Sequence, residues 1–260
     1  MRDRLSKSAL GDLLTLSEDI GIYDCENFIL EGAIERYPFS HWLGHLVPLH
    51  VKLSDDYRNR AYKALEEFDL LKNTIAENLQ YAGFSEQAKD FEIVESEADL
   101  NSIIIKQYTE ENGIYPYINN LLRKGHSGND VSHDPLVPWI CQLAVSLRQL
   151  DEYTGPSFRG SNMPSSDIEK YKVDSIYIWA PFTSASKSID SCFGGNVIFE
   201  LVPVSALSER DKRAPRDVSH ISDFPEEEEV LLPMCCAYRP TKIEERSGVT
   251  YIRSEILDHY

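Results

Sequence analysis

Four consecutive glutamates, Glu226 to Glu229, stand directly before the apolar run Val230-Leu231-Leu232-Pro233. The apolar run is typical of a buried strand, and side chains along a strand alternate between its two faces. If this alternation extends into the acidic run, Glu227 and Glu229 share one face. Two carboxylates at a strand entrance can stabilise a reaction in which positive charge develops, whereas an isolated charge run usually marks a solvated surface. Crowding of the four groups also predicts a raised pKa for at least one carboxyl.

Two further motifs upstream favour a chemical role for the acidic run. Arg159 ends a short strand expected over residues 156–159, and Gly160 follows it. The planar guanidinium suits a phosphate group, and a glycine lets a ligand approach the backbone closely. Ser184 and Ser186 stand at the end of an apolar strand and share one face, where their hydroxyls can donate and accept hydrogen bonds. Each motif alone fits an ordinary surface, but Arg, Ser-x-Ser and Glu-x-Glu at successive strand edges form a more specific pattern.

The elements that must position these motifs change in character near residue 153. Apolar spacings of three and four residues predict helices before it, over residues 5–17, 54–84, 100–109, 117–124 and 135–150. Short β-rich runs separated by turns predict strands after it, over residues 156–159, 175–183, 196–204, 230–238 and 249–252. Helices followed by strands indicate an α+β fold rather than alternating α/β. An acidic, polar stretch predicts a division into a helical extension, 1–94, and a second domain, 95–260.

Composition excludes several classes of function. Lys and Arg total 26 against 43 Asp and Glu, a net charge of −17, which disfavours nucleic acid as a partner and favours a basic protein face. The five cysteines are scattered without C-x-x-C spacing, which disfavours a zinc site or a disulfide framework and fits a reducing compartment. His41 and His45 have a metal-like spacing, but no nearby cysteine or glutamate supports a metal site. No apolar stretch approaches the roughly 18 residues of a membrane span, and no leader segment is recognisable.

The three motifs together resemble the mono-ADP-ribosyltransferases of the Arg-Ser-Glu branch, which includes vertebrate arginine transferases and many bacterial toxins and effectors. The likeness covers roughly residues 97 to 258. It includes the helical stretches 105–109 and 117–123, and its most specific part is Phe224-Pro225 followed by Glu-x-Glu-Val-Leu-Leu-Pro. The resemblance implies two short β-sheets packed face to face, flanked by helices, with NAD bound in the cleft between them.

Roles for individual residues follow from the resemblance. Arg159, beside Gly160, matches the arginine that holds the NAD phosphates. Ser184 matches the serine that positions the nicotinamide ribose and the catalytic carboxylate, and Ser186 lies on the same side. Glu229 matches the catalytic glutamate, whose charge stabilises an oxocarbenium-like state.

The resemblance also assigns acceptor and nicotinamide contacts. Glu227 and Phe224 match positions that engage the acceptor. Phe193, in a loop over residues 187–196, packs either against nicotinamide or in the core. The usual Ser-Thr-Ser pattern is altered by Ala185, which is expected on the opposite face of the strand, so activity should survive.

These residues predict transfer of ADP-ribose from NAD, as co-substrate, to a protein side chain without a metal. The Glu-x-Glu pair favours arginine as acceptor, although threonine or another residue of a host protein such as ubiquitin, actin or a GTPase also fits. We expect a secreted bacterial effector acting in the host cytoplasm, or otherwise a cytoplasmic protein, with residues 1–94 as a recognition element or a buttress. The alternatives are an NAD glycohydrolase and an inactive module that binds NAD or protein.

Overall fold

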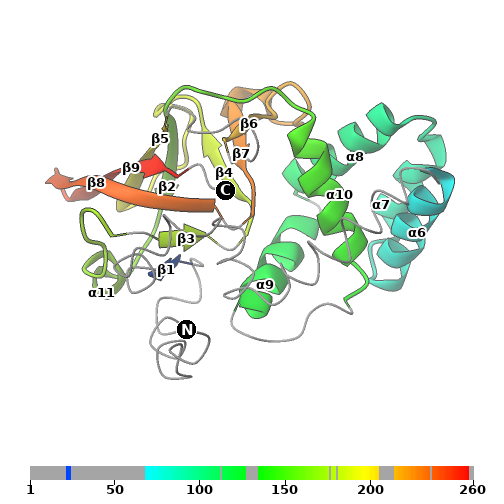
Figure 1. The fold of residues 1–260 in the computed structure, drawn as a ribbon, viewed down its shortest axis with the longest axis horizontal. Coiled ribbons are helices and arrows are strands. Elements are labelled where there is room, and N and C mark those ends of the chain that lie inside the picture. The colour runs from blue at the N-terminus through cyan, green and yellow to red at the C-terminus, as the bar shows by residue number, and fades with distance from the viewer. Residues whose placement is uncertain are drawn as a thin grey trace, which may run out of the picture. The chain divides into compact units, whose positions relative to one another are not determined.

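Two compact units make up the described part of the chain. The computed structural model describes residues 22–24, 68–111, 113–126, 134–175, 177–179, 181–204, 214–234 and 236–257. The described residues of 22–24, 152–217 and 226–257 form a sheet unit, and those of 68–151 and 218–225 form a helical unit. Figure 1 shows the strands with the short helix α11 as one group and helices α6 to α10 as the other.

The sheet unit is built on one hydrogen-bonded sheet with the strand order β1-β3-β8-β9-β5-β2-β4-β7-β6. Its strands are β1 (Ile22–Asp24), β2 (Ser157–Ser161), β3 (Tyr177–Trp179), β4 (Thr183–Ser186), β5 (Val197–Pro203), β6 (Arg216–Asp217), β7 (Glu229–Leu232), β8 (Cys236–Arg246) and β9 (Val249–Ile256). The pairing of β5 with β9 is parallel, and the other pairings between these strands are antiparallel. Two short helical segments, α11 (Ser165–Ile168) and η2 (Pro225–Glu227), stand between strands.

The sheet divides between β2 and β4, which pair only through Phe158 and Ser186. Strands β4, β7 and β6 form a short part, and the remaining strands form a longer part. Both parts contribute side chains to one core, in which Ala185, Val230 and Leu232 of the short part join Phe199 and Tyr238 of the long part. The two short sheets expected from the sequence are therefore present as two parts of one sheet that share a core, and the predicted α+β class is confirmed.

Local sequence signals explain the ends of the helices in the helical unit. Its elements are α6 (Phe68–Tyr81), α7 (Ser85–Lys89), η1 (Asp90–Ile93), α8 (Glu97–Thr109), α9 (Ile114–His126) and α10 (Val137–Arg148). Helix α6 ends before Gly83, which adopts a φ of 93° that side-chain-bearing residues rarely tolerate. Helix α8 begins after Ser96, whose hydroxyl accepts a hydrogen bond from the Asp99 N–H at 3.2 Å.

Buried polar groups connect the helices of this unit. The buried Gln107 side chain donates to the Gln87 carbonyl and to the Asp90 carboxylate, both at 2.8 Å, and accepts from Trp139 Nε1 at 3.1 Å. These bonds join α7, η1, α8 and α10 around one fully partnered amide. The segment 218–225 is held in this unit by an ion pair of 3.2 Å between Asp223 and Lys106 of α8.

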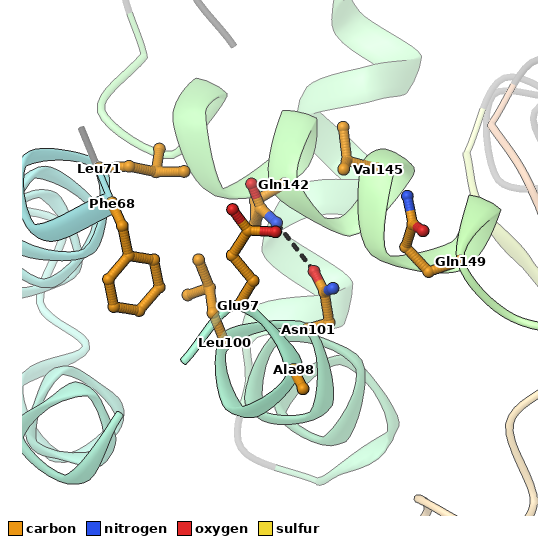
Figure 2. A pocket seen from close by; sticks show the side chains of 9 residues that line it. All are labelled: Phe68, Leu71, Glu97, Ala98, Leu100, Asn101, Gln142, Val145 and Gln149. Atoms are coloured by element: carbon orange, nitrogen blue, oxygen red, sulfur yellow. Dashed lines mark hydrogen bonds between the residues drawn. The ribbon is translucent and has the colours of Figure 1, made fainter. Parts of the chain in front are cut away.

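A cavity of about 400 Å³ lies among helices α6, α8 and α10 (Figure 2). Phe68, Leu71 and Leu100 supply apolar lining, and a hydrogen bond of 3.0 Å from Gln142 to Asn101 crosses its polar side. None of the residues that the sequence singles out for chemistry lines this cavity.

The predicted helices at 100–109, 117–124 and 135–150 are present as α8, α9 and α10, and the end of the predicted helix 54–84 is present as α6. The predicted helix 5–17, the start of the helix 54–84, and His41 with His45 lie outside the described residues. The predicted boundary at 94/95 falls within the helical unit, where α7 and η1 lie in the polar, acidic stretch on which the boundary was predicted. A separate role for residues 1–94 stays a prediction. No helix in the described ranges is long and apolar enough to cross a membrane.

Candidate active site

The pairing of β4 with β7 sorts the candidate residues onto one face. Ala185 pairs with Val230, and both side chains point into the core. The register places Ser186 opposite Glu229, so alternation puts Ser184, Ser186 and Glu229 together on the other face. Ala185 therefore lies on the opposite face from the two serines, as the sequence predicts, and the missing hydroxyl does not alter the face that carries Glu229.

Glu229 is a buried carboxyl group, with its side chain in an environment that disfavours charge. Burial raises the pKa of Glu229 to about 7, and repulsion from Glu227 acts in the same direction. A hydrogen bond with the Ser184 side chain and the positive charge of Arg159 both lower the pKa of Glu229 and so favour its ionised form. The expected increase in a carboxyl pKa is thus found at Glu229, but burial and not crowding is its largest cause.

The strand alternation expected across the whole acidic run is wrong, because β7 begins only at Glu229. Glu227 ends the 3-10 turn η2, and Glu228 takes a left-handed conformation with φ 48°. Non-glycine residues in this conformation are disfavoured by about 1 kcal/mol. Glu227 nevertheless lies within electrostatic range of Glu229, so the turn brings together the two carboxylates that the alternation argument paired.

Arg159 lies on β2, the strand that borders β4. Its guanidinium Nη1 donates a hydrogen bond to the Ser184 carbonyl at 2.7 Å. The bond fixes the half-buried arginine beside the strand that carries Ser184, and its charge acts on Glu229. Arg159, Ser184 and Glu229 thus lie on three neighbouring strands, β2, β4 and β7.

A loop over residues 187–195 leaves β4 and lies against β2 through two glycines. A Cβ added to Gly160 would overlap the Phe193 carbonyl, and one added to Gly195 would overlap the backbone of Ser161. What approaches Gly160 in this structure is therefore the chain's own backbone, where the sequence argument expected a ligand. The Phe193 side chain is 70% exposed, which contradicts the alternative of a core role and leaves its contact with nicotinamide as a prediction.

Charged and aromatic groups line the edge of this region, and the sequence analysis did not single them out. Lys187 Nζ pairs with the Asp217 carboxylate at 2.6 Å and lies 6.0 Å from the centroid of the Tyr153 ring. Burial raises the pKa of Tyr153. The positive charge of Lys187 opposes this increase, and the negative charge of Glu228 adds to it. No sequence spacing brings these four residues together, because they come from the loop after β4, from strand β6, from the turn before β7 and from the segment before β2.

Phe224, the predicted acceptor contact, belongs to the segment 218–225 of the helical unit. Its backbone N–H donates to the Ser222 hydroxyl at 3.1 Å, and its side chain is half-buried. Its role in acceptor recognition stays a prediction. Within the described residues, no group of three or more His, Cys, Asp or Glu side chains is placed to hold a metal ion.

The chain is similar to known proteins in sequence and in fold. No family model matches it. It is 32% identical over 123 residues to Mav of Mycobacterium avium (strain 104), a protein named provisionally as an NAD(+)–arginine ADP-ribosyltransferase; the match covers 46% of this chain and only 13% of that protein's length. The fold resembles HopU1, an ADP-ribosyltransferase of Pseudomonas syringae pv. Tomato DC3000, with a TM-score of 0.54, 21% identity, and coverage of 61% of this chain and 77% of HopU1. It also resembles the ADP-ribosyltransferase Vis of Vibrio splendidus, solved with the inhibitor M6, with a TM-score of 0.50, 18% identity, and coverage of 72% and 84%.

The sheet topology and these likenesses define the class: the chain has the ADP-ribosyltransferase fold. Its sequence relative and its structural neighbours are ADP-ribosyltransferases, so the resemblance predicted from the Arg, Ser-x-Ser and Glu-x-Glu motifs is confirmed. The matched relative is much longer than this chain, and the fold by itself does not assign an activity.

Proposed function

We propose that the chain is an NAD-dependent mono-ADP-ribosyltransferase that transfers ADP-ribose to a protein side chain and releases nicotinamide. The observation that carries the proposal is Glu229, a buried carboxyl group that is hydrogen-bonded to Ser184 and acted on by the charge of Arg159. Burying an ionisable carboxyl costs folding free energy. Strongly perturbed carboxyls beside a specific charge partner are typical of active sites.

The chemistry of the proposed reaction explains each group. Breaking the bond between ribose and nicotinamide develops positive charge on the sugar, which an ionised Glu229 would stabilise. Its burial makes that stabilisation stronger than it would be in water, and the Ser184 side chain favours the ionised carboxylate. Arg159 is the candidate for the NAD phosphates, since a guanidinium forms bidentate bonds with phosphate oxygens. Ser186, Gly160 and Phe193 are proposed as further NAD contacts.

Arginine is the proposed acceptor. Glu227 is half-exposed and lies within electrostatic range of Glu229, so its carboxylate can pair with a guanidinium at the reacting carbon. Phe224 is proposed as a second acceptor contact, and the net charge of −17 favours a basic acceptor surface. The name of Mav, which specifies arginine, agrees with this choice.

The proposed setting is a bacterial effector that acts inside a host cell on a protein such as ubiquitin, actin or a GTPase. The relatives reported above are bacterial proteins, which supports a bacterial origin. In this proposal residues 95–260 carry the chemistry, and residues 1–94 act as a recognition element or a buttress.

One assay separates transfer from its alternatives. The protein is incubated with labelled NAD, with and without cell lysate, and both nicotinamide release and label on protein are measured. Label on a protein band is expected; nicotinamide release without label would instead indicate an NAD glycohydrolase, and neither product would indicate a binding module. Glu229→Ala is expected to abolish release, and Glu226→Gln, which removes an exposed charge from the same run, serves as the matched control.

Glu227→Ala tests the division of roles between the two carboxylates. It is expected to reduce transfer to protein more than nicotinamide release to water, because Glu227 is assigned to the acceptor and Glu229 to the sugar. Equal losses in both products would contradict that assignment.

A further inference from the structure

Glu228, the residue between the two proposed active-site carboxylates, contacts the loop over residues 187–195 in two places. Its carboxylate Oε2 accepts a hydrogen bond from the Ser191 hydroxyl at 3.3 Å. Its carbonyl accepts one from the Lys187 N–H at 3.0 Å. The Ser191 carbonyl in turn accepts a bond of 3.2 Å from the Ser186 hydroxyl. One residue of the acidic run therefore bonds both the beginning and the middle of this loop.

The backbone of Glu228 explains how it reaches the loop. Its φ of 48° lies in the left-handed region, at the junction between the turn η2 and the strand β7. Glycine or asparagine is the usual residue at such a position. A glutamate at this position adopts an unfavourable backbone conformation, and its side chain accepts the hydrogen bond from Ser191.

The far end of the same loop lies on the strand that carries Arg159. The backbone N–H of Gly160 lowers the pKa of the Cys192 thiol, and Gly160 and Gly195 allow close packing of the loop on β2. The loop therefore bridges the strand of Arg159 and the turn before Glu229. The loop contacts β2 through its backbone and lies near it at the Cys192 sulfur, whereas Glu228 contacts the loop from the turn through its carboxylate.

We infer that Glu228 is a positioning residue that holds the loop over residues 187–195 in place for NAD binding. The inference rests on the proposed function and gives the middle residue of Glu-x-Glu a role of its own. The loop carries the exposed Phe193 and passes beside Arg159, so its release loosens the wall on which NAD is proposed to lie. The effect is expected on substrate affinity, because Glu228 contacts the loop and is assigned no contact with the reacting atoms.

The first test compares KM for NAD and kcat in four variants. Glu228→Gly removes the carboxylate and relieves the left-handed strain, so loss of folding does not confound the result. It is expected to raise KM about three- to tenfold with kcat changed less than about twofold, the size of one partly exposed charged hydrogen bond. Glu228→Gln keeps an oxygen acceptor and should return KM to within about twofold of the wild-type value. Ser191→Ala should match Glu228→Gly, and the double variant should be no worse than either single one.

The second test needs no NAD turnover. Cys192 follows Ser191 directly, is half-buried, and has a pKa raised by that burial. Release of the loop should expose this thiol, so its alkylation by iodoacetamide, followed by peptide mass spectrometry, is expected to be several-fold faster in Glu228→Gly than in the wild type. Glu226→Gln, which removes the same charge two residues away, should leave the rate unchanged.

An unchanged alkylation rate in Glu228→Gly would overturn the inference, as would a loss confined to kcat. If the wild-type protein consumed no NAD, the proposed function would fail, while the alkylation rates would still decide whether Glu228 holds the loop.

Discussion

Replacing Glu229 by glutamine is expected to stabilise the folded protein above neutral pH while it abolishes nicotinamide release. Glu229 has a folded-state pKa of about 7 against an ordinary value of 4.5, mainly because it is buried. Below pH 4.5 the group is neutral in both states and has little effect on the free energy of unfolding. Between pH 4.5 and 7 the unfolded chain ionises first, so the folded state loses stability as pH rises, and above pH 7 the full cost persists.

The size of the effect follows from that difference in pKa. Each pKa unit corresponds to about 1.36 kcal/mol, so the ionised Glu229 costs the fold about 3 kcal/mol above pH 7. Glutamine has nearly the same shape and no charge, and its amide oxygen can still accept the bond from Ser184. Allowing for burial of the amide, we expect a gain of about 2 kcal/mol at pH 8 and almost none at pH 4.

Urea denaturation of the wild type and Glu229→Gln at both pH values measures this gain. Glu228→Gln is the matched control, because it removes the same charge from an exposed side chain at the neighbouring position. It should change the free energy of unfolding by less than about 0.5 kcal/mol. Nicotinamide release by Glu229→Gln should fall by at least about 10²-fold. A gain that is equal at pH 4 and pH 8, or no gain at all, would refute the view that burial of a charge at Glu229 is maintained at a cost to stability.

Three further outcomes follow from the same site. The rate of nicotinamide release should rise with pH up to about 7 and then level off. Ser184→Ala should move this rise to higher pH, because it loses a bond that favours the ionised carboxylate, and Glu227→Ala should move it to lower pH, because it loses a repulsion. Shifts in the same direction would contradict these assignments. Gly160→Ala should destabilise the fold by about 1–3 kcal/mol, measured by thermal or urea denaturation, because its methyl group overlaps the Phe193 carbonyl; wild-type stability would show that the loop yields freely. Arg159→Lys should raise KM for NAD about tenfold, because an ammonium cannot reproduce the bidentate fork, and an unchanged KM in a titration of NAD would remove Arg159 from the phosphate contacts.

Some of the site was determined by the sequence alone. Helical spacings before residue 153 and short β-rich runs after it predicted the α+β class, because periodicity is a local property of the chain. The types and order of Arg159, Ser184 and Glu229 carried the resemblance to the ADP-ribosyltransferases. The placement of Ala185 on the opposite face also followed, because a strand has a fixed period of two residues.

Other features were decided only by tertiary structure. The alternation across Glu226 to Glu229 failed because β7 begins at the fourth residue of the run. Glu228 takes a left-handed conformation and bonds Lys187 and Ser191, which are distant in sequence. The partner of Gly160 is a loop more than thirty residues away in sequence, so a glycine there could not reveal whether ligand or backbone approaches it.

The pKa of Glu229 shows the same division. The chain places a carboxylate at a strand entrance beside three others, and crowding was the only cause that could be read from that pattern. Burial, the largest cause, arises when β4 and the rest of the sheet unit close around the strand. Desolvation depends on which distant segments exclude water from a group, and that is fixed by packing and not by the order of neighbouring residues.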